Sequence, residues 1–319
     1  MACVEGRARA YASSANLGPG FDVLAVALDA FYDEVYVEVC DAGGEAVAVV
    51  ESVEGPYSAG IDLDGNTARL AVNALLEGER VGGVRAGISI YKSIPPGRGL
   101  GSSGASAAAS VVAAARALGL NPSPHRLIGY AGLGESVSAG SPHYDNVAAS
   151  LLGGLVVVAV RGREVLAAYR APLDGAWFAI VVPMVEVPPS KTGFMRSVLP
   201  GTIPLGEAAA NFGRSAALVA AAHHGDLEAM GRLMMSDDIV EPARSKFTPC
   251  YSEVKKAALE SGALGFYLSG AGPAMVALAR GRESAERIAS SMREACSCCG
   301  DAIALPSSPA PGALEVEVV

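Results

Sequence analysis

Strand-like and helix-like patterns of hydrophobic positions alternate along the chain. Apolar residues that alternate with polar ones, or that form short continuous runs, predict strands. Such runs lie at residues 7–12, 35–39, 46–50, 86–91, 155–160, 164–168, 177–182, 264–268, 302–305 and 314–319. Apolar residues at helical spacing predict helices at residues 68–76, 107–118, from 123 onward, 205–222, 226–235, 249–261 and 283–296. This mixture predicts an α/β chain whose second half is α+β.

The length and composition indicate a two-domain enzyme. A chain of 319 residues with 51% hydrophobic content is long enough to bury a large core. The turn-rich segment 171–175 is the boundary that we expect, which gives domains of residues 1–172 and 173–319. No run of 18 apolar residues occurs, and residues 1–7 lack the apolar core of a signal peptide. We therefore expect a soluble, cytoplasmic protein.

The net charge and the cysteines limit the possible functions. A formal charge of −9 argues against nucleic acid as a partner, because binding to phosphate backbones needs a basic face. Cys296 and Cys299 have the spacing of a metal or redox pair, but no second pair accompanies them. Reduced structural thiols are therefore the interpretation that we favour for the six cysteines.

A glycine-rich segment, residues 95–104 with the sequence PPGRGLGSSG, joins a predicted strand to a predicted helix. Glycines let the backbone approach a phosphate closely, and the free N–H groups at a helix start attract negative charge. A dinucleotide-binding fingerprint is excluded because no Asp or Glu lies between residues 105 and 134. A Walker A loop is excluded because no Lys follows the glycines, and the chain has no His-Arg-Asp or Asp-Phe-Gly tripeptide of protein kinases.

This segment resembles the central motif of the GHMP kinases, Pro-x-x-x-Gly-Leu-Gly-Ser-Ser-Ala, with Gly104 in place of the last Ala. Two other segments occur in the order expected for the family. Residues 14–22, SANLGPGFD, are similar to the N-terminal signature of its homoserine kinase branch, and residues 269–274, SGAGPA, are similar to its third motif. The resemblance spans residues 11–275. It implies an N-terminal ATP-binding half like ribosomal protein S5 domain 2 and a ferredoxin-like C-terminal half.

The resemblance also implies the residues of an ATP and Mg²⁺ site. The phosphate loop corresponds to Pro96, Gly97, Gly99, Leu100, Gly101, Ser102 and Ser103. Asn66 stands where a helix cap is expected, and the family has an asparagine there close to the nucleotide base. Glu135 alone would be interpreted as a solvated helix residue. In the family, however, a Glu at this point binds Mg²⁺ together with the second loop serine, here Ser103.

A second set of residues matches the amino-acid site of the homoserine kinase branch. Its members are Asn16, Asp22, His143, Asp145, Asn146, Thr192, Arg196 and Arg244. Capping and surface roles would explain each of them separately. A pair of arginines suits a substrate carboxylate, through bidentate hydrogen bonds. The resemblance puts Asp145 at the substrate amino group and leaves Asn146 to orient the hydroxyl. We predict Asn146, Asp145 and Ser103 as the catalytic residues and expect that no strong base is required.

The activity that the resemblance implies is phosphorylation of the side-chain hydroxyl of L-homoserine by ATP, a step in threonine biosynthesis. One alternative is a kinase for another small alcohol, such as mevalonate or shikimate. Another is a non-catalytic ligand sensor on the same scaffold, which the presence of Ser103 and Glu135 disfavours. Neither nucleic acid nor a membrane is an expected partner. The sequence leaves open whether the chain acts alone or as a homodimer.

Overall fold

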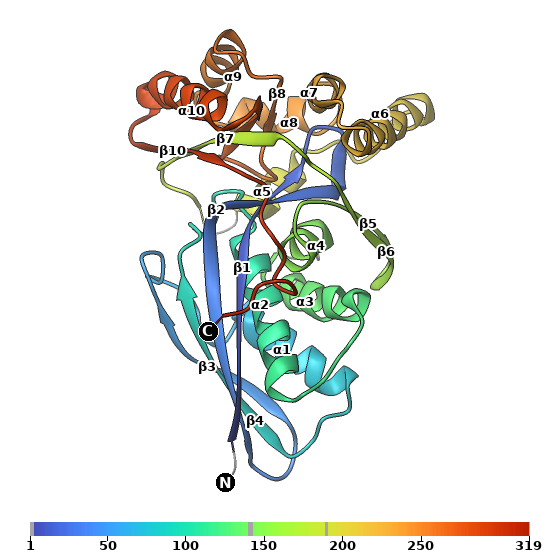
Figure 1. Cartoon of the computed structure of the whole chain (residues 1–319), viewed down its shortest axis with the longest axis vertical. Coiled ribbons are helices and arrows are strands. Elements are labelled where there is room, and N and C mark those ends of the chain that lie inside the picture. Colours follow the sequence, from blue (N-terminus) through green and yellow to red (C-terminus); the bar gives the residue numbers. More distant parts are fainter. Residues whose placement is uncertain (1–2, 140–142, 189–190, 319) are drawn as a thin grey trace.

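The computed structural model describes residues 3–139, 143–188 and 191–318, which form two units that each contain a sheet (Figure 1). The first sheet has the order β3-β4-β2-β5-β6, with β1 paired to β2, and only β3 and β4 are parallel. Its strands are β1 (Cys3–Asn16), β2 (Gly20–Asp41), β3 (Val47–Glu54), β4 (Val84–Lys92), β5 (Leu155–Arg161) and β6 (Glu164–Ala171). The helices of this unit are α1 (Thr67–Gly78), α2 (Ser102–Ala117), α3 (Pro124–Ala139) and α4 (Tyr144–Leu152).

Helix α2 is the central helix of the first unit. It contacts β1, β2, α1, α3 and α4, and all its residues except Ser103 and Arg116 are buried. Its many alanines allow this close packing, because a small side chain keeps neighbouring backbones near one another. A Cβ on Gly6 of β1, for example, would lie 2.0 Å from the carbonyl oxygen of Ala113. The glycine-rich loop before α2 is therefore attached to a helix that is held on several sides.

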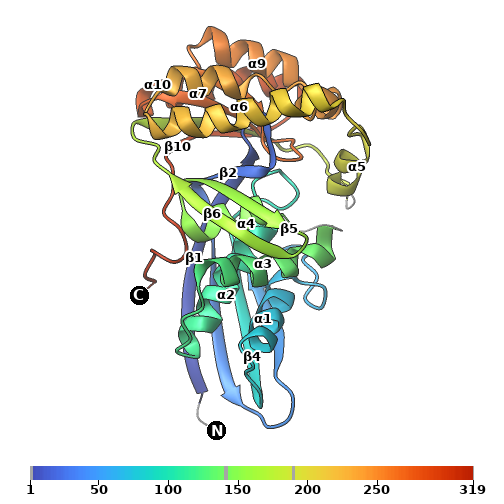
Figure 2. The same ribbon diagram turned by 90° about the vertical axis from the view of Figure 1, so that its right-hand side faces the viewer.

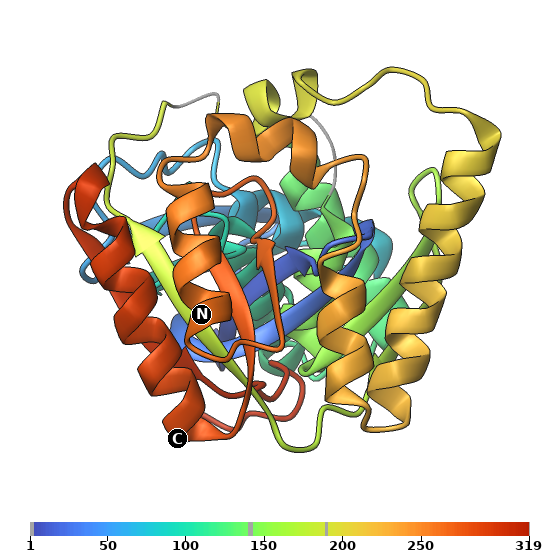
Figure 3. The same cartoon turned by 90° about the horizontal axis from the view of Figure 1, so that it is seen from above.

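The second sheet is antiparallel, with the order β10-β7-β9-β8. Its strands are β7 (Ala176–Pro183), β8 (Gly265–Leu268), β9 (Met275–Arg280) and β10 (Ala302–Ser307). Alternate residues of β7 face two cores: Val181 packs with α9 and α10, whereas Ile180 joins the core that continues into the first unit. The helices of this unit are α5 (Lys191–Ser197), α6 (Leu205–His223), α7 (Leu227–Met234), α8 (Glu241–Arg244), α9 (Tyr251–Glu260) and α10 (Arg282–Cys296). Figure 2 and Figure 3 show α6 and α7 beside each other, with α9 and α10 farther along the same unit.

Several local expectations from the sequence were wrong. Residues 314–318 form no strand; instead the chain after β10 returns to the first unit, where Pro309 bridges Leu28 and Pro311 bridges Gly153. The prolines at 188 and 189 favour an extended connector over residues 187–192, but α5 begins at Lys191, and residues 189 and 190 lie outside the described part of the chain. Strand β9 was not predicted. Residues 18–22, GPGFD, are rich in residues that favour turns, but strand β2 begins among them, at Gly20.

The cysteines also differ from the expectation of reduced thiols. Cys3 and Cys40, which face each other on β1 and β2, form a disulfide. A second disulfide joins Cys250, before α9, to Cys299, after α10, while Cys296 and Cys298 are free. The two disulfides tie together segments that are 37 and 49 residues apart in sequence. Among the described residues, no helix is both long and apolar enough to span a membrane.

Candidate active site

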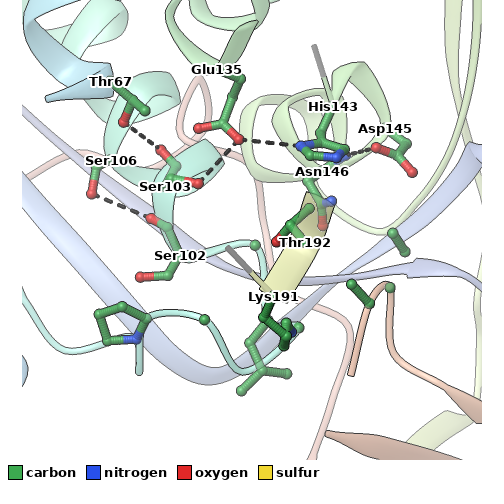
Figure 4. Close-up of a pocket in the computed structure, with 18 of the residues that line it drawn as sticks. Thr67, Ser102, Ser103, Ser106, Glu135, His143, Asp145, Asn146, Lys191 and Thr192 are labelled. Carbon is green, nitrogen blue, oxygen red and sulfur yellow. Dashed lines mark hydrogen bonds and ion pairs between the residues drawn. The ribbon is translucent and has the colours of Figure 1, made fainter. Parts of the chain in front are cut away.

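A cavity of about 290 Å³ lies between the two units. Residues from the glycine-rich loop, the turn between β1 and β2, and the start of α1 line it from the first unit. Helices α3 and α4 add residues from the same side, and α5, α8 and residues 270–271 close it from the second unit. Figure 4 shows the polar side chains that point into it. Every residue predicted above for nucleotide, metal or substrate lines this cavity.

The glycine-rich loop has a left-handed backbone conformation, which favours glycine, at Gly97, Gly99 and Gly101. Gly99 and Gly101 have φ values of 85° and 63°, in the left-handed region. A Cβ on Gly99 would lie 2.4 Å from the carbonyl oxygen of Ser269, and one on Gly101 would lie 2.1 Å from Oγ of Ser13. The loop therefore passes directly against β1 and against the loop after β8. This contact brings the central and third sequence motifs together.

Hydrogen bonds between the two units fix this arrangement. The backbone N–H of Ala274 donates to the carbonyl oxygen of Arg98 (3.0 Å), and the Ser269 hydroxyl donates to the carbonyl oxygen of Gly99 (2.6 Å). From the first unit, the N–H of Ser13 donates to the carbonyl oxygen of Leu100 (3.1 Å). The Ser102 hydroxyl donates to the carbonyl oxygen of Ile94 (2.9 Å), so it supports the loop from behind. The neighbouring Ser103 side chain is exposed to the cavity.

Ser103 and Glu135 form a pair of hard oxygen donors. The Ser103 hydroxyl donates to Oε2 of Glu135 at 3.0 Å, and Glu135 is almost fully buried on α3 (Figure 4). Nδ1 of His143 lies 3.6 Å from the same carboxylate oxygen. Burial opposes the charged form of His143, but Glu135, Asp145 and Asp22 outweigh it and raise its pKa. A buried carboxylate and a hydroxyl that faces the cavity are hard oxygen donors, the kind that suits Mg²⁺.

Asp145 and Asn146 start helix α4 and face the same cavity. Asp145 is buried, and this burial, followed by the charge of Asp22, raises its pKa to about 6. The amide oxygen of Asn146 accepts a hydrogen bond from the Ser13 hydroxyl at 2.9 Å. The Asn146 side chain is thereby oriented next to the glycine-rich loop. Tyr144, which lies between His143 and Asp145 in the sequence, is buried against Gly132.

Two arginines from the second unit lie above Phe21 of the first. Nη2 of Arg196 is 3.0 Å from Oδ2 of Asp22, whereas Arg244 donates to the carbonyl oxygens of Met195 (3.0 Å) and Gly270 (2.9 Å). Their guanidinium carbons lie 5.4 and 5.1 Å from the Phe21 ring centroid. Burial lowers the pKa of Arg244 to about 10. Both guanidinium groups therefore lie in a partly buried site where they could bind an anion.

The turn that supplies Asn16 and Asp22 has a strained backbone. Asn16, Leu17 and Asp22 have positive φ values of 79°, 48° and 57°. A Cβ on Gly18 would lie 2.0 Å from the carbonyl oxygen of Met234, which explains why glycine is needed there. Non-glycine residues in this region are uncommon and cluster at functional sites. The amide of Asn16 donates to the carbonyl oxygen of Gly270 at 3.3 Å, which joins this turn to the second unit.

The sequence reasoning missed two lysines of the cavity. Lys92 is buried beneath the glycine-rich loop, and Lys191 enters from α5 next to Thr192 (Figure 4). Neither belongs to a motif used above, although Lys191 directly precedes a residue that does. Asn66 is both a helix cap and a cavity residue. Its side-chain oxygen accepts a hydrogen bond from the N–H of Ala68 (3.0 Å) at the start of α1, and the residue also lines the cavity.

Comparisons with known proteins agree with this architecture. Residues 66–154 match the family model for the GHMP kinases N-terminal domain, and residues 218–298 match the model for the GHMP kinases C-terminal domain. The chain is 57% identical to a homoserine kinase of Aeropyrum pernix over 98% of its length and 99% of the relative. It is 45% identical to a homoserine kinase of Pyrobaculum neutrophilum, over 86% and 89% of the two chains.

Solved structures give the same result. A crystal structure of homoserine kinase from Cytophaga hutchinsonii superposes with a TM-score of 0.87 at 34% identity, covering 97% of this chain and 96% of that one. A mevalonate kinase of L. major shares the fold at 18% identity, with a TM-score of 0.68 and coverage of 98% and 97%. The two family models, the long relatives and the arrangement of the three motifs around one cavity have a single explanation: the chain belongs to the GHMP kinase family.

Proposed function

We propose that this protein is a homoserine kinase, which transfers the γ-phosphoryl group of ATP to the side-chain hydroxyl of L-homoserine. The observation that carries the proposal is the ion pair between Asp22 and Arg196, which line the same cavity as the glycine-rich loop. Homoserine is a zwitterion with one ammonium and one carboxylate. A site whose own carboxylate and guanidinium pair across the cavity offers one partner to each end of such a substrate. Mevalonate has no ammonium group and would leave Asp22 and Asp145 unpaired.

Substrate binding would replace this internal pair with two pairs to the ligand. Arg196 and Arg244 bind the carboxylate, while Asp22 and Asp145 bind the ammonium group. The arginines share contact with Phe21, so they are held near each other before the substrate arrives. Asn16, His143 and Thr192 line the same part of the cavity and complete the polar contacts. Leaving a buried charge unpaired is costly, which gives the site selectivity for α-amino acids over plain alcohols.

The nucleotide occupies the other end of the cavity. Residues 96–101 offer a glycine-rich backbone to the phosphates, with Ser102 and Ser103 at the N-terminus of α2. Asn66 lies at the start of α1, where the base is expected. Ser103 and Glu135 would hold Mg²⁺, since their oxygens are 3.0 Å apart beside the loop, with Glu135 buried and Ser103 open to the cavity. When bound, the cation neutralises phosphate charge and supports an in-line geometry.

The reaction needs positioning more than acid–base chemistry. The homoserine side-chain oxygen forms a bond to the γ-phosphorus as the bond from that phosphorus to the ADP oxygen breaks. The proton of the hydroxyl passes to an oxygen of the transferred phosphoryl group, so a strong base is not required. Asn146, oriented by Ser13, holds the hydroxyl for attack. Asp145 acts at the ammonium group.

The test is ADP release by the purified protein with Mg²⁺ and ATP, using L-homoserine, mevalonate, shikimate or no acceptor. We expect turnover with homoserine only, and a large increase of KM for homoserine in Arg196→Met without a matching change for ATP. Turnover with another alcohol would retain the kinase and reject the substrate. ATP binding without turnover on any acceptor would favour a ligand sensor. The resemblance to homoserine kinases also supports a role in threonine biosynthesis, and the lack of a signal-peptide core in residues 1–7 supports a location in the cytoplasm.

A further inference from the structure

Lys191 is a cation of the active site that no motif identified. It is the first residue of α5, and its ammonium donates a hydrogen bond to the carbonyl oxygen of Gly272. It lines the main cavity and also a neighbouring, mostly apolar cavity of about 430 Å³ on the other side of α5. The lysine therefore forms part of the wall between the two. Figure 4 shows it on the same side of the pocket as Thr192, which precedes Arg196 by one helical turn.

Lys92, the other lysine of the cavity, has a structural role, because the protein itself satisfies its ammonium group. Nζ of Lys92 lies 2.5 Å from Oδ2 of Asp33 and also donates to the carbonyl oxygen of Ser102 (2.8 Å) and to Oγ of Ser106 (2.6 Å). All three of its donors are thus used within the protein. In the described residues, Lys191 forms one hydrogen bond and no ion pair. Two of its donors remain for a ligand.

The position of its one partner shows which ligand is in reach. A Cβ built on Gly99 of the phosphate loop would lie 3.0 Å from the carbonyl oxygen of Gly272, to which Lys191 donates. The ammonium is therefore next to the phosphate loop. Arg244 donates instead to the carbonyl oxygen of Gly270, two residues earlier on the same loop, which also accepts from Asn16. Arg244 is thus held beside Asn16, whereas the acceptor of Lys191 lies directly against Gly99.

We propose that Lys191 binds the γ-phosphoryl group of ATP and neutralises its charge during transfer to the acceptor hydroxyl. This inference rests on the proposed kinase function and adds a catalytic residue to it. The ammonium keeps its proton throughout: the acceptor oxygen bonds to the γ-phosphorus, the bond to ADP breaks, and Lys191 hydrogen bonds to a non-bridging oxygen. Charge neutralisation of this kind is the main contribution that a protein makes to phosphoryl transfer.

The electrostatic surroundings of Lys191 agree with an anionic ligand. Burial, and then the positive charges of Arg244 and Arg98, lower its pKa to about 7. The other charged side chains that line its two cavities are Asp22, Asp62, Lys92, Glu135, His143, Asp145, Glu186 and Arg196. A buried ammonium beside other cations is unfavourable in the empty site, and a bound phosphate removes that penalty. Binding of ATP must then raise the pKa of Lys191 and draw a proton from solution above pH 7.

The experiment compares wild type, Lys191→Met, Lys191→Arg and Lys246→Met for homoserine-dependent ADP release. We expect kcat of Lys191→Met to fall by about 10²- to 10³-fold, the typical effect of removing one donor to a developing charge. Lys191→Arg should regain part of this loss. Lys246→Met removes an exposed lysine nearby and should match wild type. If wild type phosphorylates homoserine and Lys191→Met retains its kcat, this inference is wrong while the proposed function stands.

A pH series separates a charge role from a structural one. For wild type, kcat/KM for ATP should fall as the pH rises above about 7, because the free ammonium loses its proton. Arginine stays charged, so the same limb should be absent in Lys191→Arg. Calorimetry with a non-hydrolysable ATP analogue, in buffers of different ionisation enthalpy, should show more proton uptake by wild type than by Lys191→Arg. Equal proton uptake by the two proteins would overturn the assignment.

Discussion

At the scale of single residues, Gly104, which stands where the family motif has alanine, has more space around its Cα and a different φ from Gly101. A Cβ on Gly104 would meet Cβ of Asn146 and Cγ2 of Val147 at 3.5 Å, which is ordinary van der Waals contact. Its φ is not in the left-handed region, unlike that of Gly101. We therefore expect Gly104→Ala to raise the free energy of unfolding by about 0.5–1 kcal/mol, as alanine replaces glycine in a helix. Denaturant unfolding measures this, and a decrease would show that Asn146 or Val147 cannot tolerate the methyl group.

The contrast between these glycines also shows what a sequence motif can and cannot reveal. The motif predicted a glycine-rich turn followed by a helix start, and both are present at residues 95–104. It could not distinguish Gly101, where a Cβ would collide with Ser13, from Gly104, where it would fit. That difference depends on β1, which is nearly ninety positions away in the chain. The site residues of the cavity were predicted by resemblance, whereas Lys191 was missed because no motif contains it.

Asp145 should give the homoserine reaction an acidic limb. Burial, and then Asp22, raise its pKa to about 6, and the proposed role requires the carboxylate form. We expect kcat/KM for homoserine to fall by roughly tenfold for each unit of pH below 6. In Asp145→Asn, kcat/KM for homoserine should be low at every pH and should not fall further below pH 6. A wild-type profile that is flat from pH 7 to pH 5 would remove Asp145 from the ammonium site.

The raised pKa of Asp145 has the opposite pH dependence for stability: the free energy of unfolding falls as the carboxyl ionises. The folded pKa lies above the ordinary value of 3.8, so the folded protein binds this proton more tightly than the unfolded chain. The stabilising contribution of the protonated carboxyl is therefore complete below about pH 4 and is lost as the pH rises to about 6. Ionised Asp145 thus costs stability at the pH at which the proposed activity is greatest, which is common at functional sites.

At the scale of secondary-structure elements, one buried ion pair connects β2, β4 and α2. Asp33 on β2 pairs with Lys92 on β4 and also accepts hydrogen bonds from the N–H groups of Ser93 and Ile94. Lys92 in turn donates to Ser102 at the start of α2. We expect Lys92→Met to lower the free energy of unfolding by about 3–5 kcal/mol, since Asp33 would be left buried without its cation. Lys256→Met, which removes a lysine from an exposed pair, should change it by less than about 1 kcal/mol. Chemical unfolding of both variants measures the two changes in the free energy of unfolding, and equal changes would contradict this role of Lys92.

Elements with a clear local period were predictable, and elements defined by distant contacts were not. Helix α10 was predicted within one residue of its observed bounds because its apolar residues recur at helical spacing, whereas helix α2 begins at Ser102, before the predicted start at residue 107. Strand β2 starts earlier than expected because Gly20 and Asp22 look like a turn, although pairing with β1 continues there. Helix α5 follows a proline-rich segment that predicted extended backbone. Its position depends on the contact of Arg196 with Asp22 and on the hydrogen bond from Arg244 to the carbonyl oxygen of Met195, and no local pattern in the sequence indicates these contacts.

At the scale of the whole molecule, the chain crosses between the two units twice. The last strand of the first sheet ends at Ala171 and the first strand of the second begins at Ala176. We propose the boundary at residues 172–173, as expected from the turn-rich sequence, with one amendment. After β10 the chain returns to the first unit, where Ala310 and Ala313 are fully buried. The sequence could not predict this return, because the prolines at 306, 309 and 311 interrupt any regular period.

This returning segment should contribute strongly to stability. The N–H of Ala310 donates to Ala27 (2.9 Å), its carbonyl oxygen accepts from Gly154 (2.9 Å), and the N–H of Ala313 donates to Ser150 (2.9 Å). Since each backbone hydrogen bond contributes about 0.5–1.5 kcal/mol, removal of residues 308–319 should lower the free energy of unfolding by on the order of 3 kcal/mol or more. Removal of residues 317–319 keeps these contacts and serves as the control.

The returning segment also links the units, because it leaves β10 of the second sheet and pairs with β2 of the first. Asp29 on β2 accepts hydrogen bonds from the Ser307 hydroxyl (2.8 Å) and from the N–H of Ser308 (2.8 Å). Losing this link should weaken the contact between the units that form the cavity. We therefore expect the longer truncation to raise KM for both ATP and homoserine. If the two truncated proteins unfold at the same denaturant concentration and share the same KM values, the segment is not a structural link between the units.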